Sequence, residues 1–238
     1  MGINEFWKHL KPIHHANAPL SEVLKDKRLG VDAQALIHQK FMHFCAEELL
    51  HKNTKKMCTS LVGWIRKLRD QYNCDVVLVF DGHEPAVKDK EMIRRRARRS
   101  RNEQVARELV KAGDTSELAG KIYSQAMSLE DSFIADCVAA VKRSGLCEID
   151  PFYAPYEGEA QLGYMSRVGE IHAVYTGDSD IFLFNPSVQV IRDIDFKKKS
   201  CDAYLPPLRL DVNNGPRFGD RAGLQHWPKE ITNGIESY

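Results

Sequence analysis

Four carboxylates lie close together in the stretch from residue 153 to residue 185. They form two clusters, Glu157 with Glu159 and Asp178 with Asp180. The second cluster follows a short apolar run at residues 173–175 and a Thr-Gly turn, so it should lie where a strand ends. In open α/β sheets, ligands bind at the carboxyl ends of the strands. The spacing therefore predicts acidic side chains at a ligand-binding edge.

Two more aspartates end strand-like runs elsewhere in the chain. Asp32 follows the run at residues 29–31, and Asp81 follows the run at 76–80, whose unbroken apolar character is typical of a strand buried on both faces. Taken singly, each acid has a simpler explanation as a helix cap or as a partner of a helix dipole. Six carboxylates converging on one edge, however, would repel one another unless cations lay between them. Such hard oxygen ligands favour Mg²⁺ or Mn²⁺ over zinc.

Strand-like and helical segments alternate along the 238 residues. This alternation predicts a single α/β domain with a mostly parallel central sheet flanked by helices. Apolar periodicity predicts helices at residues 33–50, 59–72, 116–127 and 129–144, another helix opening at Glu157, and a further strand at 188–191. Two local signals complete the pattern: the His14-His15 pair predicts a polar loop, and Gly145 predicts a helix C-cap.

Composition narrows the class of protein. The formal net charge is only +1, so the overall charge balance does not indicate a nucleic-acid partner. Six cysteines occur without a Cys-x-x-Cys pair, which argues against a zinc site and for reduced thiols in a reducing compartment. No apolar run approaches the ~18 residues that a membrane span needs, and the start lacks a signal-peptide pattern. We therefore expect a soluble, intracellular protein.

Residues 88–111 are strongly basic. Lys88 and Arg95 are seven positions apart, so they would share one face of a helix, with Arg99 close by. Alone, such a run is usually just a solvated helix face or an import signal. Its position directly after Asp81 favours a phosphodiester substrate, because cations beside a metal site would offset charge on the nucleic-acid backbone and on the transition state.

These motifs together resemble those of the flap endonuclease/XPG-type 5′-nucleases and, within them, the exonuclease 1 branch. The matching segments are Met1-Gly2-Ile3, Val31-Asp32-Ala33, Val79-Phe80-Asp81-Gly82, the Lys88 and Arg95 pair, Ala154-Pro155-Tyr156-Glu157-Gly158-Glu159-Ala160-Gln161-Leu162 and Thr176-Gly177-Asp178-Ser179-Asp180. The resemblance extends from residue 1 to about residue 195, and the two acidic motifs, in this order and at this spacing, are highly specific.

The resemblance implies a set of metal ligands and of residues that contact the substrate. The implied metal ligands are Asp32, Asp81, Glu157, Glu159, Asp178 and Asp180. They would hold two Mg²⁺ ions, for which Mn²⁺ could substitute, in a two-metal hydrolysis of phosphodiester bonds. The implied catalytic residues are Asp81, Asp178, Lys88 and Arg95, the last two on a basic helical arch that steers the scissile phosphate. The implied DNA contacts are Gly2, His38, Lys88, Arg95 and Arg99.

The expected organisation follows the same resemblance. Residues 1–100 form an N-terminal nuclease region, residues 101–195 form an internal nuclease region of the same structural domain, and residues 196–238 form an irregular C-terminal tail. In the family, a Gly-Cys-Asp-Tyr motif supplies a seventh carboxylate and a helix-two-turn-helix then grips duplex DNA, but neither is found in this sequence. The tail contains Asp211, Asp220 and Glu230, none of which matches that motif.

The expected function is that of a Mg²⁺-dependent, structure-specific DNA nuclease, either a 5′ exonuclease or a flap endonuclease. Its expected partner is DNA with a 5′ end, a flap or a single-strand/duplex junction, and its expected location is the nucleus, in repair or replication. Two alternatives remain open. A non-catalytic DNA-binding member of the family would suit the missing motif, and a PIN-like RNA endonuclease would suit the short chain, although the long basic segment speaks against it. No membrane partner is expected, and the sequence identifies no protein partner.

Overall fold

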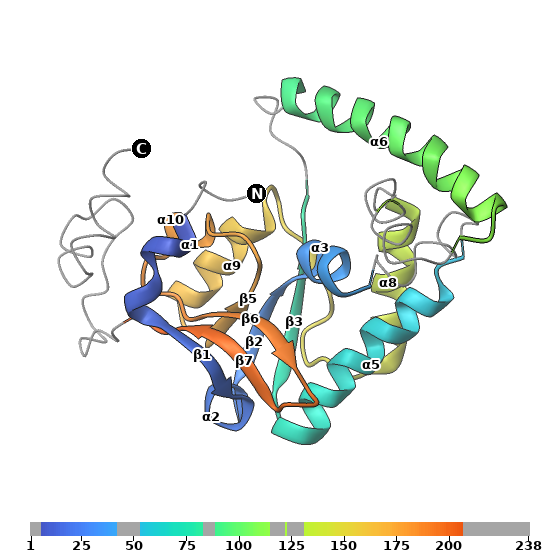
Figure 1. Ribbon diagram of the computed structural model, residues 1–238. Helices are drawn as coiled ribbons and strands as arrows, with labels where there is room; N and C mark the ends of the chain where they lie inside the picture. Colours follow the sequence, from blue (N-terminus) through green and yellow to red (C-terminus); the bar gives the residue numbers. More distant parts are fainter. Residues whose placement is uncertain (1–5, 42–52, 83–88, 115–121, 123–130, 207–238) are drawn as a thin grey trace.

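A seven-stranded sheet forms the centre of the computed structural model, which describes residues 6–41, 53–82, 89–114, 122 and 131–206 (Figure 1). The strands are β1 (His14–Pro19), β2 (Arg28–Asp32), β3 (Asp75–Phe80), β4 (Phe152–Tyr153), β5 (Ala173–Tyr175), β6 (Val190–Asp195) and β7 (Ser200–Tyr204). Their order is β1-β7-β6-β5-β2-β3-β4. The five strands from β6 to β4 are parallel, and β7 is antiparallel to both of its neighbours. The predicted α/β class with a mostly parallel sheet is confirmed.

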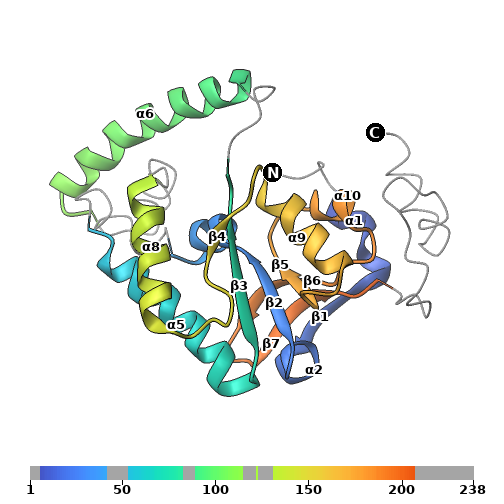
Figure 2. The same ribbon diagram turned by 180° about the vertical axis from the view of Figure 1, so that it is seen from behind.

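Helices cover both faces of this sheet (Figures 1 and 2). The helical elements of the described residues are α1 (Phe6–His9), η1 (Lys11–Ile13), α2 (Leu20–Leu24), α3 (Ala33–Leu36), the π-helical turn η2 (Ile37–Phe41), α5 (Lys55–Tyr72), α6 (Asp89–Lys111), α8 (Asp131–Ser144), α9 (Gly158–Arg167) and α10 (Ile181–Phe184). The core residues of α2, α3, α5 and α8 lie on one face of the sheet, and those of α9 and α10 lie on the other. None of the helices in the described part of the chain is long and apolar enough to cross a membrane.

Strand β3 shows how the two faces are filled. Its residues Val76, Leu78 and Phe80 belong to the core cluster beneath α5, whereas Val77 and Val79 belong to the cluster beneath α9. Successive side chains of a strand point to opposite faces, so a strand with apolar residues at every position must be covered on both sides. The unbroken apolar run in the sequence is explained by this double burial.

Two segments that were expected to be irregular are strands instead. His14–Pro19, expected to include a polar loop, forms β1, and the expected tail at 196–238 begins with β7 (Ser200–Tyr204), which lies inside the sheet between β1 and β6. The two strands pair with each other, and the His14 ring stacks on Tyr204 with ring centroids 4.7 Å apart. These long-range contacts stabilise both strands, although the local sequence of each segment has only a weak preference for strand structure. The rest of the tail, residues 207–238, lies outside the described residues.

The expected helices differ from the observed ones mainly at their ends. Helix α5 begins four residues before the expected start at residue 59, α8 begins at Asp131, and the strand expected at 188–191 runs from Val190 to Asp195. Helix α3 gives way to a π-helical turn after Leu36. Gly145 ends α8 with a left-handed φ of 60°, as predicted for a C-cap. Of the helix expected at residues 116–127, only Ile122 is described.

The basic segment after β3 forms the long helix α6. It lies beyond the carboxyl ends of the strands, across the upper side of the molecule in Figure 1. Near the end of α6, Ala106 is fully buried and Leu109 packs against the core, whereas Ala97, Ser100 and Arg101 are exposed. The helix therefore rests on the body of the protein through its last turns, and nine of its residues are Lys or Arg.

Candidate active site

The carboxyl ends of β2, β3 and β5 meet at one edge of the sheet. In the parallel register Asp32 is paired with Val79, and Val31 is paired with Tyr175. The segments that follow these strands therefore start side by side. This register brings the acids after the three strands to the same edge as the first turn of α9, as predicted from the sequence.

Asp32 serves two purposes at this edge. It is the N-cap of α3, where its Oδ1 accepts a hydrogen bond from the Ala35 N–H at 2.9 Å. Its Oδ2 accepts a hydrogen bond from the Thr176 hydroxyl at 3.2 Å. The side chain is only 6% exposed, and this burial, with the nearby charge of Asp81, raises the pKa of Asp32. Asp32 is therefore a helix cap, as the simpler explanation predicts. Capping does not account for its raised pKa or for its contact with Thr176.

Glu159 is the second perturbed acid. Burial is the largest cause of its raised pKa, and the negative charges of Asp32, Asp81 and Asp178 raise the pKa further. For Asp32, the side-chain interaction with Glu159 acts in the opposite direction and lowers the pKa. Four acids from β2, β3, β5 and α9 thus form one electrostatically coupled cluster, which we call the carboxylate cluster.

Backbone contacts hold Asp81 against the start of α9. Its Oδ1 accepts a hydrogen bond from the Gly158 N–H at 2.7 Å. The next residue, Gly82, donates its N–H to the carbonyl of Tyr156, also at 2.7 Å. A Cβ atom at Gly82 would lie 1.8 Å from the backbone oxygen of Ala154, so only glycine fits this close approach. The end of β3 and the acidic helix start are therefore locked together.

Thr176 organises the other half of the cluster. It is 1% exposed, donates its hydroxyl hydrogen to Asp32, and accepts a hydrogen bond from the Asp178 N–H at 3.1 Å. Asp178 in turn accepts a hydrogen bond from the Asp180 N–H at 3.1 Å. Sequence reasoning treated Thr176 only as part of a turn. The signal that could have identified it is a hydroxyl residue placed between a buried strand and an acidic loop.

The structure describes the remaining predicted site residues in different degrees of detail. Glu157 is the half-buried N-cap residue of α9, and Asp180 is half-buried in front of α10. His38 is exposed in the π-helical turn that follows α3. Gly2 and Lys88 lie outside the described residues. Arg95 and Arg99 lie in α6, of which only the backbone is described at these two positions.

The chemistry of the carboxylate cluster fits a hard divalent cation. Among the described residues, no group of three or more His, Cys, Asp or Glu side chains is arranged around a point that could hold a metal ion. The donors themselves are carboxylate oxygens, which is the set that Mg²⁺ prefers. Their mutual repulsion, seen in the raised pKa values of Asp32 and Glu159, is what a bound cation would relieve. Asp32, Asp81, Glu159 and Asp178 are therefore the candidate ligands.

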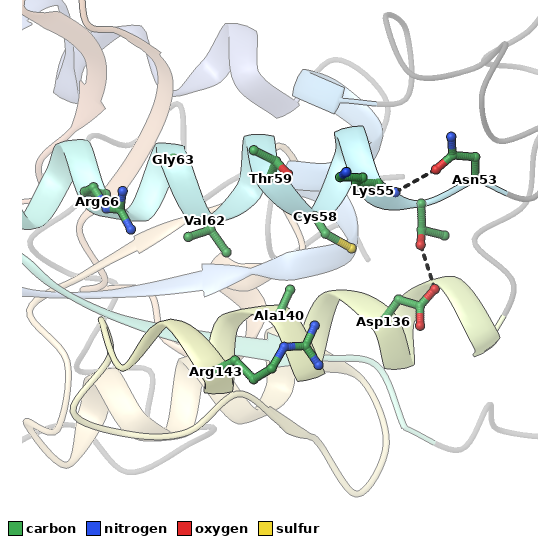
Figure 3. Close-up of a pocket in the computed structure, with 11 residues that line it drawn as sticks. Asn53, Lys55, Cys58, Thr59, Val62, Gly63, Arg66, Asp136, Ala140 and Arg143 are labelled. Carbon is green, nitrogen blue, oxygen red and sulfur yellow. Dashed lines mark hydrogen bonds between the residues drawn. The ribbon is translucent and has the colours of Figure 1, made fainter.

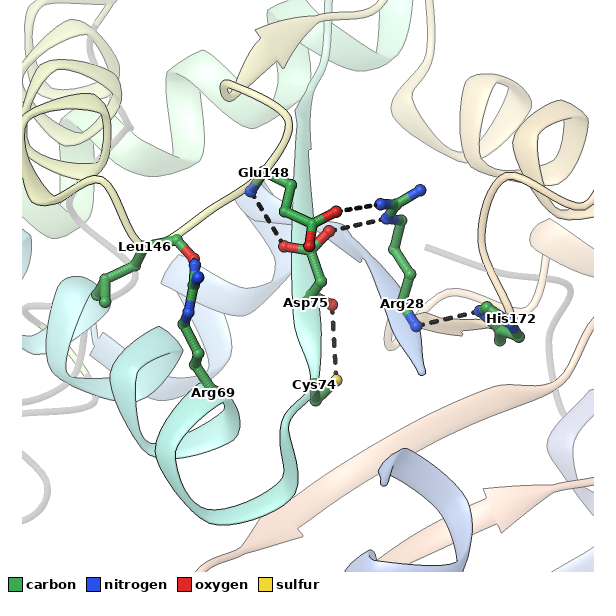
Figure 4. A network of polar contacts seen from close by, with 7 residues as sticks. All are labelled: Arg28, Arg69, Cys74, Asp75, Leu146, Glu148 and His172. Atoms are coloured by element: carbon green, nitrogen blue, oxygen red, sulfur yellow. Dashed lines mark hydrogen bonds and ion pairs between the residues drawn. The ribbon is translucent and has the colours of Figure 1, made fainter. Parts of the chain in front are cut away.

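Two polar regions elsewhere share no residue with the carboxylate cluster. One is a groove between α5 and α8, shown in Figure 3. The other lies at the opposite, amino-terminal edge of the sheet, where the Arg28 guanidinium contacts Asp75 at 2.8 Å and Glu148 at 2.5 Å (Figure 4). The Arg28 backbone N–H also donates to His172 Nδ1 at 3.1 Å. This second region ties β2 and β3 to the loop before β4, so its contacts have a structural explanation.

The fold is similar to those of several solved structures. The catalytic core of Rad2 with DNA substrate aligns with a TM-score of 0.59 and 22% identity, over 86% of this chain and 55% of that one. Human GEN1 with Holliday junction DNA aligns with a TM-score of 0.53 and 19% identity, over 86% of this chain and 44% of that one. The architecture is therefore that of the FEN/XPG nuclease cores.

Sequence comparison identifies the family. The XPG N-terminal domain matches residues 1–102, and the XPG I-region matches residues 148–219. The chain belongs to the XPG/FEN superfamily. It is 30% identical to exonuclease 1 of Xenopus laevis over 77% of this chain, and 26% identical to flap endonuclease 1 of Methanocaldococcus jannaschii over 81%. It spans 24% of the length of the first relative and 60% of the second.

Proposed function

We propose that this chain is a Mg²⁺-dependent, structure-specific DNA nuclease that acts as a 5′ exonuclease or flap endonuclease. The observation that carries the proposal is the coupling of Asp32, Asp81, Glu159 and Asp178 at the carboxyl edge of the sheet. Membership of a superfamily whose named relatives are nucleases supports it. The DNA in the Rad2 and GEN1 structures supports a DNA substrate with a 5′ end, flap or junction. A nuclear location and a role in repair or replication belong to the same proposal.

The carboxylate cluster would perform the chemistry. Two divalent ions bound there, Mg²⁺ or Mn²⁺, would supply an activated water and stabilise the leaving oxygen of an in-line displacement. Asp32, Asp81, Glu159 and Asp178 would hold the ions, with Glu157 and Asp180 completing the ligand set. Only the carboxylate form of Glu159 is a good ligand, so a bound ion would compete with the proton that the raised pKa of this group favours.

The basic helix would bind the substrate. Helix α6 follows β3 directly and carries nine Lys or Arg residues beyond the carboxyl edge. In the proposal, Lys88 and Arg95 contact the scissile phosphate, and Gly2, His38 and Arg99 contact the DNA. Phosphate contacts of this kind make affinity fall steeply with salt concentration, since binding releases counterions from the nucleic acid.

Removing single acids from the carboxylate cluster tests the proposal. We expect Asp81→Ala and Asp178→Ala to lower the cleavage rate of an end-labelled 5′-flap by at least ~10²-fold, because each change deletes a proposed ligand of the metal ions that would stabilise the transition state. Asp70→Ala removes an exposed acid from α5 and serves as the matched control with the wild-type rate. Circular dichroism and thermal melting establish that all three variants fold. A wild-type rate in either cluster variant would show that the cluster is not the catalytic site.

The same assay distinguishes the two alternatives. Matched DNA and RNA flaps are compared under identical conditions, and we expect cleavage of DNA to be faster. Equal or faster cleavage of RNA would favour a PIN-like RNA endonuclease. Retained DNA binding with no cleavage by the wild-type chain would favour a non-catalytic member of the family.

A further inference from the structure

Helices α5 and α8 pack against each other and bring two cysteines together. The sulfur atoms of Cys58 on α5 and Cys137 on α8 are 3.7 Å apart. A disulfide bond requires about 2.05 Å between the sulfur atoms. Neither cysteine is in a disulfide bond, and their sulfur atoms are direct neighbours.

The two cysteines differ in accessibility. Cys58 is half-buried and lines the groove between the helices, and Figure 3 shows its sulfur projecting from α5 toward α8. Cys137 is 0% exposed. A reagent in solution would therefore meet Cys58 first, and Cys137 would react through Cys58.

Cys58 also has the electrostatic surroundings of a nucleophile. The hydrogen bond with Cys137 lowers the pKa of Cys58, and the Arg143 charge acts in the same direction, although burial and the Asp136 charge oppose them. Burial instead raises the pKa of the other described cysteines, to about 12 for Cys74 and Cys201 and about 11 for Cys147. Because the thiolate is the reactive form, Cys58 should be the most reactive of the described thiols.

The groove beside Cys58 can admit a small anionic molecule. Its volume is about 640 Å³, and it is lined by the cations Lys55, Arg66 and Arg143. Asp136, the one acid among the described residues that line it, accepts a hydrogen bond from the Thr54 hydroxyl at 2.6 Å. An anionic disulfide the size of glutathione disulfide matches this excess of positive charge.

We propose that Cys58 and Cys137 form a reversible disulfide that links α5 to α8, made by exchange with a small anionic disulfide such as glutathione disulfide. The Cys58 thiolate attacks one sulfur of glutathione disulfide, and the departing glutathione thiolate takes up a proton. Cys137 then loses its proton, its sulfur attacks the Cys58 sulfur of the mixed disulfide, and the second glutathione leaves. Two protein thiols are oxidised and one disulfide is reduced to two thiols, so no further oxidant is needed.

The bridge would restrain the part of the molecule that carries the basic helix. The chain between Cys58 and Cys137 contains β3 and α6. A disulfide would close this segment into one covalent loop and reduce the freedom of the unfolded chain. We expect the oxidised protein to melt about 5 °C higher than the reduced protein.

Peptide mapping of the full chain tests the inference without reference to cleavage activity. The protein is equilibrated in glutathione buffers of increasing oxidised fraction, alkylated, digested without reductant and analysed by mass spectrometry. We expect one dominant cross-linked peptide, joining Cys58 to Cys137, that dithiothreitol removes. Absence of this peptide at every ratio, or cross-links spread over several cysteines, would overturn the proposal.

Single variants test the order of attack. Cys137→Ser should accumulate glutathione on Cys58, because the second thiol is missing. Cys58→Ser should leave Cys137 unmodified, and Cys147→Ser, which removes a thiol of raised pKa, should form the bridge as the wild type does. Equal glutathione uptake by Cys137 in the Cys58→Ser variant would contradict the assigned roles.

Discussion

Glu159 combines partial burial with three acidic neighbours, and this combination has a thermodynamic consequence. Its pKa is raised from 4.5 to about 8 in the folded protein. Well below pH 4.5 both the folded and the unfolded states hold the proton, so Glu159 adds no pH dependence to the free energy of unfolding. As pH rises from 4.5 toward 8, the unfolded chain loses its proton more readily than the folded protein, so stability falls. Without a metal ion, the acid therefore costs stability near neutral pH.

Glu159→Gln should remove this cost. At pH 8 with chelator present, we expect the variant to be more stable than the wild type by up to about 4 kcal/mol, and the difference to vanish near pH 4. Urea denaturation at the two pH values measures both differences. Glu170→Gln, at an exposed position after α9, is the control and should show no pH-dependent gain. An unchanged or lower stability of Glu159→Gln at pH 8 would contradict the assigned charge environment.

Thr176 is the second residue whose role can be isolated. Thr176→Val keeps the shape of the side chain but removes the hydrogen bond to Asp32 and the acceptor for the Asp178 N–H. We expect a loss of about 1–2 kcal/mol in the free energy of unfolding and weaker Mg²⁺ binding by titration calorimetry. Thr176→Ser keeps the hydroxyl and should restore Mg²⁺ binding. Identical Mg²⁺ affinity in the valine variant would show that Thr176 does not organise the cluster.

At the scale of the elements, the site depends on how closely the end of β3 approaches the segment before α9. Gly82 lies in contact with the backbone of Ala154, and the Gly158 N–H reaches Asp81. Both contacts involve main-chain atoms, which cannot move aside as a flexible side chain can. The distance between Asp81 and the acids of α9 is thus determined by backbone packing.

Gly82→Ala tests this dependence. The added methyl group would meet the Ala154 carbonyl oxygen, so we expect a loss of about 1–3 kcal/mol and reduced nuclease activity. Gly63→Ala is the matched control, because a Cβ there has open space within 4 Å and α5 is a helix. That variant should gain up to about 1 kcal/mol from higher helix propensity. Thermal or urea unfolding of both variants gives the comparison, and equal stability changes would contradict it.

At the scale of the whole molecule, the features that were predicted correctly from the sequence are those marked by residues close together in the chain. The run before Asp81 marks a buried strand, and Gly145 marks a helix end. By contrast, β1 and β7 were missed because they are held by pairing with each other across almost the full length of the chain. The role of Thr176 was missed for a related reason, since its partner Asp32 is distant in sequence.

Some predictions about the site remain predictions. The sequence placed six acids at one edge, and the structure shows four of them coupled electrostatically, but their roles as metal ligands require measurement. The proposed contacts of Lys88, Arg95 and Arg99 with phosphate, and of Gly2 and His38 with DNA, also remain to be tested. The division of the chain at residues 100 and 101 and at residues 195 and 196 stays a prediction, and β7 in the sheet lies within the segment expected to be irregular.

The most direct test of the central claim is cleavage of an end-labelled 5′-flap and a recessed-end duplex by the full chain. The reaction is run with Mg²⁺, with Mn²⁺ and with chelator, and DNA binding is measured in parallel. We expect short 5′ products with either metal and none with chelator. Bound but uncleaved DNA with both metals would contradict the claim that the carboxylate cluster is a metal-dependent nuclease site.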